Sequence, residues 1–322
     1  MHLDPDRRGA VRRVDAGPCF AGEQFLAQRV PVLPAGRYEQ AAPEEDGEAR
    51  LIQEAVPEEI SDHDVVFLCE RGELASNVAA ACGPTTVVID LVDGLPPRFE
   101  PRLVHPAIES DEPKTPHGYY SVPHKLSLIA TDLLHTLDRE LGVREVVGTI
   151  LRPAADHGRE GLEELRAQTA NILNFAEMPT KVFGAQLAFN VLGCSAESDA
   201  DALAERVADE TGRLLGWTDR RMTLSLLTVP VFHGHCLRFR IRFAEPVSPE
   251  RVREVVSTAR FIDAPEDDPP STPVDVSADR RLVLHDVRSD GIGGIWISAV
   301  AGGSGSSAAE DAVRLAERVV GL

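Results

Sequence analysis

The feature that most restricts the fold of this chain is a strand, helix, strand pattern in residues 62–95, which read DHDVVFLCERGELASNVAAACGPTTVVIDLVDGL. Two apolar runs, Val65 to Leu68 and Thr86 to Leu91, flank a helical stretch. Strands without polar alternation are buried on both faces, and parallel strands need a crossover helix between them. The pattern therefore predicts an α/β fold with a parallel sheet.

Residues beyond this unit alternate between helical and extended patterns. A turn at Pro123 precedes a helical pattern, and a later helix is expected to have Ser248 as its N-cap and Pro249 at its first position. We expect helices in 126–141, 158–174, 200–216, 248–261 and 306–322, and strands in 144–151, 222–247 and 294–303. In the first 60 residues, only residues 22–30 have a helical pattern.

Residues 222–247 are predicted to form a long strand region with two different faces. The alternation predicts that the apolar face is buried and that the arginines lie on the other. The first face carries Val231, His233, His235, Leu237, Phe239, Ile241 and Phe243, and the second carries Arg238, Arg240 and Arg242.

Charge and composition exclude several classes of partner. The chain has 33 Lys and Arg against 52 Asp and Glu, a net charge of −19, which argues against nucleic acid and anionic membranes. No apolar run is long enough to span a bilayer, and the first residues lack the apolar core of a signal peptide. Five cysteines without a CxxC pair favour reduced thiols over disulfides or zinc. We expect a cytoplasmic protein.

Four segments in this order resemble the aspartate-semialdehyde dehydrogenase family, with the closest likeness to its Usg-like paralogues. They are VVFLCERGELAS with VVIDL, GREGLEELRAQTANILN with FGAQLAFNVL, TVPVFHGHCLRFRI, and GIWISAVA with SSAAEDAVRLAE. The resemblance implies a Rossmann-type parallel-sheet domain and an inserted α+β dimerisation domain. It places a degenerate NAD(P)-binding domain in residues 1–123, completed by helix 304–322, and the dimerisation and catalytic domain in residues 124–303.

Active members of the family reduce an acyl phosphate with NADPH through a cysteine thioester, and most of the matched site residues differ here. The nucleophile position falls at His124 or Lys125, and neither can form a thioester. The substrate-orienting glutamine falls at Leu151, with Arg152 beside it, and the carboxylate-binding arginine falls at Thr228. The resemblance thus implies that the reaction is lost, although Lys125 could form a Schiff base and His124 could act as a base.

His235 matches the general acid/base of the family, while a histidine held by a backbone carbonyl would occupy the same apolar strand face. His233 and His235 could together bind a metal, but no third ligand is evident and we predict no metal site. The phosphate loop of the cofactor site is reduced to Gly17 and Gly22, and Ser306 and Ser307 stand at the start of the last helix. NADP binding is therefore expected to be weak, and these serines also suit a plain N-cap.

Three functions fit these residues. The first is a pseudoenzyme that keeps the scaffold and has a regulatory or scaffold role. The second is an NADP-dependent oxidoreductase acting on another aldehyde or acyl substrate, with His235 as acid/base. The third is a structural subunit that pairs with an active paralogue. We expect a homodimer through residues 124–300, in which the arginine face of one subunit meets carboxylates of its partner.

Overall fold

The computed structural model describes residues 63–69, 71–106, 108, 118–193, 200–259, 262–264, 272–276, 282–302 and 306–320, apart from the side chains of 306–310 and 320, and the backbone of 44–45 and 48–49. The chain divides into two compact units. Unit 1 comprises Met1–Lys125 and Gly305–Leu322, and unit 2 comprises Leu126–Ser304. Each unit is described by itself. The expected helix at residues 22–30 lies outside the described residues.

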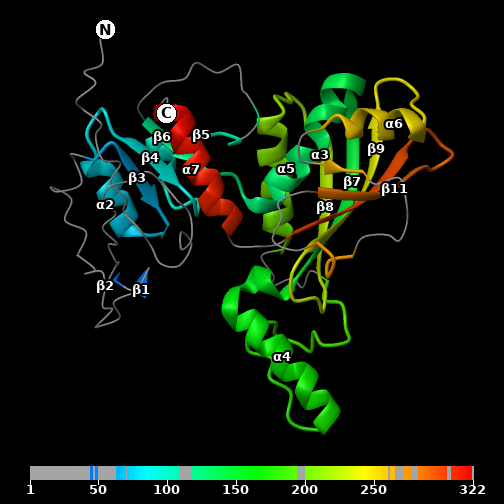
Figure 1. The fold of residues 1–322 in the computed structure, drawn as a ribbon, viewed down its shortest axis with the longest axis horizontal. Helices are drawn as coiled ribbons and strands as arrows, with labels where there is room; N and C mark the ends of the chain where they lie inside the picture. Colours follow the sequence, from blue (N-terminus) through cyan, green and yellow to red (C-terminus); the bar gives the residue numbers. More distant parts are fainter. Residues whose placement is uncertain are drawn as a thin grey trace. The chain divides into compact units, whose positions relative to one another are not determined.

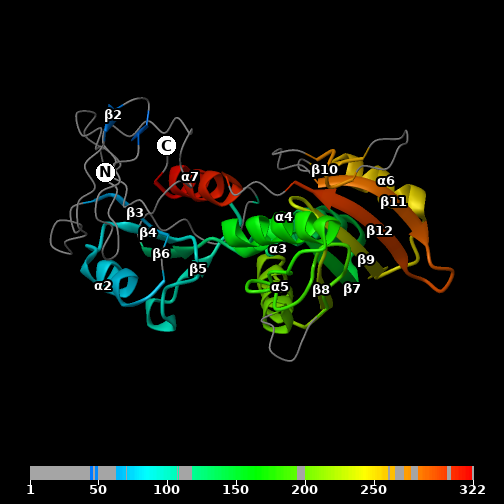
Figure 2. The same cartoon turned by 90° about the horizontal axis from the view of Figure 1, so that it is seen from below.

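Unit 1 contains a four-stranded sheet of order β3-β4-β6-β5 in which every neighbouring pair is parallel. Helices α2 and α7 lie on opposite faces of this sheet (Figures 1 and 2). The predicted Rossmann-type parallel sheet is thereby confirmed. The elements are β3 Val65–Leu68, α2 Glu73–Ala81, β4 Val87–Asp90, the 3₁₀ turn η2 Pro97–Phe99, β5 Arg102–Leu103, β6 Gly118–Ser121 and α7 Ser306–Val320; a separate antiparallel pair is formed by β1 Glu44–Glu45 and β2 Glu48–Ala49.

Helix α2 forms because its small apolar residues recur at helical spacing on one face. Ala75, Val78 and Ala79 are buried and pack against Val66 and Val88 of the sheet. Gly72 precedes the helix at φ 120°, in the left-handed half of backbone space where glycine is favoured. The strand, helix, strand unit predicted from residues 62–95 is therefore confirmed.

Unit 2 is built on a six-stranded mixed sheet of order β10-β11-β12-β9-β7-β8 (Figure 2). The pairs β10/β11 and β7/β8 are parallel and the other three are antiparallel. The strands are β7 Val143–Arg152, β8 Met222–Thr228, β9 His235–Phe243, β10 Ile262–Asp263, β11 Leu282–Ser289 and β12 Ile295–Ala301. The helices are α3 Lys125–Leu141, α4 Gly158–Asn174, α5 Ala200–Leu214 and α6 Pro249–Ser257, with the 3₁₀ turn η3 Ala154–His157 before α4.

One core joins α3, α5 and α6 to a single face of the mixed sheet. Leu133 and Leu137 of α3, Val207 of α5 and Val256 of α6 are fully buried against strand residues such as Phe239. Each such side chain contributes about 1.5–3 kcal/mol by its burial. Helix α4 instead extends away from the sheet (Figure 1), so the predicted two-part α/β architecture has an additional helical projection.

The long strand region predicted at 222–247 is wrong as a single strand. It forms β8 and β9, which are joined by a turn at residues 229–234. His233 lies in this turn and is exposed, whereas His235 is fully buried in β9, so the two histidines do not share a strand face. Gly234 in the turn has φ 87°, and a Cβ there would lie 2.9 Å from Pro273 Cβ. The alternation predicted for β9 itself is confirmed, because Leu237, Phe239 and Ile241 are buried.

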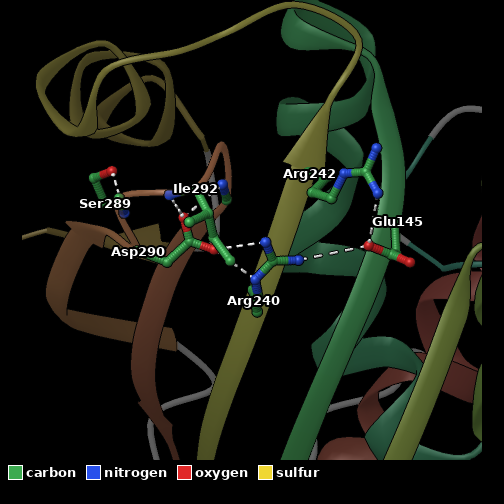
Figure 3. Close-up of polar contacts among 8 residues, drawn as sticks. Glu145, Arg240, Arg242, Ser289, Asp290 and Ile292 are labelled. Atoms are coloured by element: carbon green, nitrogen blue, oxygen red, sulfur yellow. Dashed lines mark hydrogen bonds and ion pairs between the residues drawn. The ribbon is translucent and has the colours of Figure 1, made fainter.

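The arginines on the other face of β9 form ion pairs with acidic residues of the same chain. Arg240 contacts Asp290 at 2.6 Å and Glu145 at 3.5 Å, and Arg242 contacts Glu145 at 3.4 Å (Figure 3). Arg238 lies 3.6 Å from Asp286. Acids of neighbouring strands thus already partner these arginines, and the contact between the arginine face and carboxylates of a second subunit stays a prediction.

Asp290 is the most heavily bonded of these acids. Its carboxylate accepts hydrogen bonds from the N–H groups of Ile292 and Gly294 and from Arg240 (Figure 3). The Ile292 N–H contributes most, and together these donors hold the pKa of Asp290 below its usual value against the opposing effect of burial. The tight β11–β12 turn is thereby fixed to β9.

Two further features complete the outline. Ser248 caps α6 by accepting a hydrogen bond from the Arg251 N–H, with Pro249 at the first position, as predicted. Strand β11 was not anticipated from the sequence. Within the described residues, none of the helices combines the length and the apolar character needed to cross a bilayer.

Candidate functional site

Three polar residues form a row across adjacent strands of unit 2. Strand β7 pairs with β8 so that Arg152 lies beside Thr228, and it pairs with β9 so that Leu151 lies beside Cys236. Because successive side chains point to opposite faces, His235, which precedes Cys236, lies on the same face as Arg152 and Thr228. On β7, the preceding residue on this face is Ile150, which is part of the hydrophobic core. The row stands where the apolar face of the sheet ends.

A turn after β7 brings an acid over this row. Pro153 follows Arg152 and favours an extended conformation before it and a break after it. The 3₁₀ turn η3 follows, and its Ala154 and Ala155 N–H groups donate to Val231 O and Phe232 O at 2.8 and 3.1 Å. Residues 154–157 are thereby tied to the β8–β9 turn, and Asp156 is placed beside His235.

Asp156 joins Arg152 and His235 in one buried cluster. Nε2 of His235 lies 3.0 and 3.1 Å from the two carboxylate oxygens of Asp156. Nε of Arg152 donates to Oδ2 of the same carboxylate at 3.1 Å. The side chains of Asp156 and His235 are each 1% exposed and that of Arg152 is 13% exposed. A carboxylate so deeply buried is retained because it is paired on both sides.

This geometry limits the acid/base chemistry of His235. Its Nε2 is held by Asp156, and its Nδ1 is buried and makes no hydrogen bond within the described part of the chain. Carboxylate contact at one ring nitrogen fixes the ring and leaves the other to exchange a proton. Proton transfer would therefore have to occur at Nδ1, which solvent does not reach in this conformation.

The other residues matched to the family site are not all part of this cluster. Leu151 is half-buried and points to the opposite face, with Cys236. Thr228 is half-buried in the row, and its backbone N–H and C=O pair with Leu192 at 2.9 Å each. Arg152, rather than Leu151, is therefore the β7 residue that shares a face with His235 and Thr228.

The predicted nucleophile turn has the expected backbone. Strand β6 ends at Ser121, the Val122 N–H donates to Asp90 O at 2.8 Å, and α3 begins at Lys125 after Pro123. His124 and Lys125 are half-buried, and both make further contacts. They belong to unit 1, whereas the Asp156 cluster belongs to unit 2.

The predicted cofactor residues are described only in part. Gly17 and Gly22 lie outside the described residues, and Ser306 and Ser307 are the first two residues of α7. At the carboxyl edge of the parallel sheet, the buried Asp90 accepts hydrogen bonds at 2.8–3.0 Å from the N–H groups of Val92, Gly94 and Leu95. The Asp90 carboxylate therefore stabilises the loop that follows β4.

The described thiols offer no nucleophile beside His235. Cys82 and Cys236 are free, and burial raises the pKa of both, that of Cys82 to about 11. Cys19 and Cys194 lie outside the described residues. Within the described ranges, His, Cys, Asp and Glu form no group of three that could hold a metal ion.

Sequence reasoning missed Asp156. The available signal was an acid four residues after Arg152 and directly after a proline-terminated strand, but its pairing with His235 bridges 79 positions. No local pattern reports a contact of that separation.

Comparison with known proteins gives a consistent set of relatives. Residues 136–299 match the family described as semialdehyde dehydrogenase, dimerisation domain. The aspartate-semialdehyde dehydrogenase of Prochlorococcus marinus is 24% identical over 255 residues, covering 76% of this chain and 73% of that protein. A USG-1 protein homolog of Pseudomonas aeruginosa is 30% identical over 189 residues, covering 58% and 55%.

Solved structures share the fold along almost the whole chain. Aspartate semialdehyde dehydrogenase II from Vibrio cholerae has a TM-score of 0.82 at 21% identity, covering 97% of this chain and 98% of that chain. Aspartate semialdehyde dehydrogenase with NADP from Candida albicans has a TM-score of 0.62 at 15% identity, covering 88% and 85%. At these identities the likeness shows a common two-part fold.

Proposed function

The chain belongs to the semialdehyde dehydrogenase family, and from this we propose that it is an aspartate-semialdehyde dehydrogenase-like protein that has lost the dehydrogenase reaction and serves a regulatory or scaffold role. The relatives include both aspartate-semialdehyde dehydrogenases and USG-1 protein homologs. The scaffold and one histidine are retained, while the matched nucleophile, glutamine and arginine positions hold other residues.

The observation that carries this proposal is the absence of a usable thiol at the histidine, among the described residues. Cys236 is the neighbour of His235 in sequence, yet it lies on the opposite face of the sheet, and burial raises its pKa. A thioester requires a thiolate aimed at the same substrate atom that the acid/base serves. His124 and Lys125, at the matched nucleophile position, supply no sulfur.

The direct test is phosphate-dependent formation of NADPH from aspartate semialdehyde and NADP, followed by absorbance. The aspartate-semialdehyde dehydrogenase of Prochlorococcus marinus, assayed alongside, serves as the active control. We expect no rate above the enzyme-free blank, because loss of the covalent step removes most of the acceleration. A rate that rises with protein concentration and disappears without phosphate would contradict the proposal.

The alternative is an NADP-dependent oxidoreductase acting on another aldehyde or acyl substrate. It is favoured by the retention of His235 with a carboxylate on Nε2, and it requires that the buried Nδ1 become accessible for proton transfer. It also requires a nucleotide site, for which Gly17, Gly22, Ser306 and Ser307 are the candidates. Calorimetric titration with NADPH separates the two functions. We expect weak or no binding, whereas a dissociation constant in the low micromolar range would favour the oxidoreductase.

The assembly that we propose is a homodimer through the domain at residues 124–303. The matched family is a dimerisation domain, which supports this assembly. A structural subunit that pairs with an active paralogue is the second assembly to test, by co-purification with such a paralogue. We also propose a cytoplasmic location, consistent with the net charge of −19 and with free thiols at Cys82 and Cys236.

A further inference from the structure

Lysine is scarce in this chain, and one of its lysines is partly buried. Of the 33 Lys and Arg residues, 30 are arginine, and the lysines are Lys114, Lys125 and Lys181. Lys181 is exposed, Lys125 is half-buried, and Lys114 lies outside the described residues. Arginine keeps its charge in proteins, whereas lysine is the basic residue that can lose its proton on burial. Position 125 therefore carries a primary amine, which none of the arginines supplies.

The main chain that leads to Lys125 is held in place by the sheet of unit 1. Strand β6 ends at Ser121, and the Val122 N–H donates to Asp90 O of β4 at 2.8 Å. Val122 and Pro123 are buried, and the proline ring fixes its own φ angle. The backbone before Lys125 is thus ordered, so the amine is attached at a defined place.

This place is the carboxyl edge of the parallel sheet. Strands β3, β4, β6 and β5 run in the same direction, and the turn that ends at Lys125 follows β6 directly. In open parallel sheets, ligands bind outside the carboxyl ends of the strands. The amine of Lys125 is therefore attached at the edge of the sheet where a small molecule is expected to bind.

The start of α3 is an unfavourable place for a fixed positive charge. The first N–H groups of a helix lack intrahelical partners, and this end of the helix carries a partial positive charge. Helix α3 begins at Lys125, whereas its Arg139 lies in the last turn, where a cation is favoured. The helix dipole therefore gives no reason for a cation at position 125, but an uncharged amine is tolerated there and is a nucleophile.

We propose that Lys125 captures a small aldehyde as an imine. The lone pair of its Nζ forms a bond to the carbonyl carbon, a proton passes from the nitrogen to the carbonyl oxygen, and the carbinolamine loses water as the C=N bond forms. The step involves no oxidation or reduction, and addition of water releases the aldehyde unchanged. The capture goes beyond the proposed function, because it uses neither NADP nor phosphate.

The test is reductive trapping in the full chain, with propanal as the probe. Sodium cyanoborohydride reduces the imine to a stable secondary amine, and peptide mapping by mass spectrometry gives the alkylation rates of Lys125 and Lys181 separately. In the folded chain at neutral pH, we expect Lys125 to react about tenfold faster than Lys181, the ratio that about 1.4 kcal/mol of transition-state stabilisation produces. The rate at Lys125 should reach a maximum as the propanal concentration rises, and the two rates should become equal in urea.

Lys125→Arg and Lys181→Arg are matched variants, because each exchanges one primary amine for a guanidinium that keeps the charge. Lys125→Arg should lose the fast, saturable alkylation, and Lys181→Arg should retain it. Thermal melting checks that both variants fold, and the comparison of the folded and the urea-treated unmodified chain decides the question if Lys125→Arg unfolds. Alkylation of Lys125 no faster than that of Lys181 in the folded chain, or an equal excess in urea, would overturn the proposal.

Discussion

Replacing Asp156 with asparagine is expected to lower the free energy of unfolding of unit 2 by about 3 kcal/mol. The substitution keeps the size of the side chain and one oxygen acceptor for His235, but it removes the negative charge. Arg152 then stays charged, with its side chain 13% exposed and with no described acid as its partner. An arginine does not escape this cost by deprotonation.

The magnitude follows from comparing two pairs of the same spacing. Arg152 with Asp156 and Arg159 with Glu163 are both four residues apart, with N to O distances of 3.1 and 2.7 Å. The second pair is 89% and 62% exposed, and surface pairs of this kind add little to stability because water screens both charges. Breaking a buried pair costs about 3–5 kcal/mol, and the partial exposure of Arg152 places this case at the lower end.

The assay is urea unfolding followed by tryptophan fluorescence. The chain has two tryptophans, Trp217 and Trp296, and both lie in unit 2, so the signal reports on the unit that carries the change. Glu163→Gln is the matched control. The double variant Arg152→Gln with Asp156→Asn should recover part of the lost stability, because the uncompensated charge is gone. If Asp156→Asn and Glu163→Gln lower the free energy of unfolding by the same amount, the reasoning from burial is wrong.

Three other predictions concern the thiols, the packing and the assembly. Burial raises the pKa of Cys82 from 9.0 to about 11, so its thiolate fraction at pH 8 falls by about 100-fold. Iodoacetamide labelling of Cys82, mapped by mass spectrometry, should therefore be slow until urea unfolds the chain, and fast labelling of the folded chain would refute this. Gly148→Ala should lower the free energy of unfolding by about 1–3 kcal/mol, since the new Cβ would overlap Phe239 and lie 3.0 Å from Arg238 O. An unchanged urea midpoint would show that β7 and β9 can move apart to accommodate the methyl group. Light scattering at micromolar concentration should give twice the chain mass, and a mass near 34.9 kDa would exclude the proposed homodimer.

Local patterns in the sequence were sufficient to predict the helices and strands in which buried residues recur at a regular spacing. The apolar runs at β3 and β4, the helical spacing of α2 and the cap at Ser248 all depend on residues within a few positions of one another. The alternation in β9 likewise predicted which face would be buried. These features come from backbone geometry, which a short stretch of sequence expresses on its own.

Only the tertiary structure decided what the polar residues contact. Residues 222–247 are divided into two strands by a turn at Gly234, which packs closely against Pro273. Arg240 and Arg242 form ion pairs with Glu145 of the same chain. The tertiary structure also placed Asp156 against His235 across 79 positions and set Arg152, rather than Leu151, on the face of the histidine. Such pairings depend on the sheet order β10-β11-β12-β9-β7-β8, in which β7 and β9 lie side by side although they are distant in sequence. That order is fixed by how the whole core packs, which no single segment encodes.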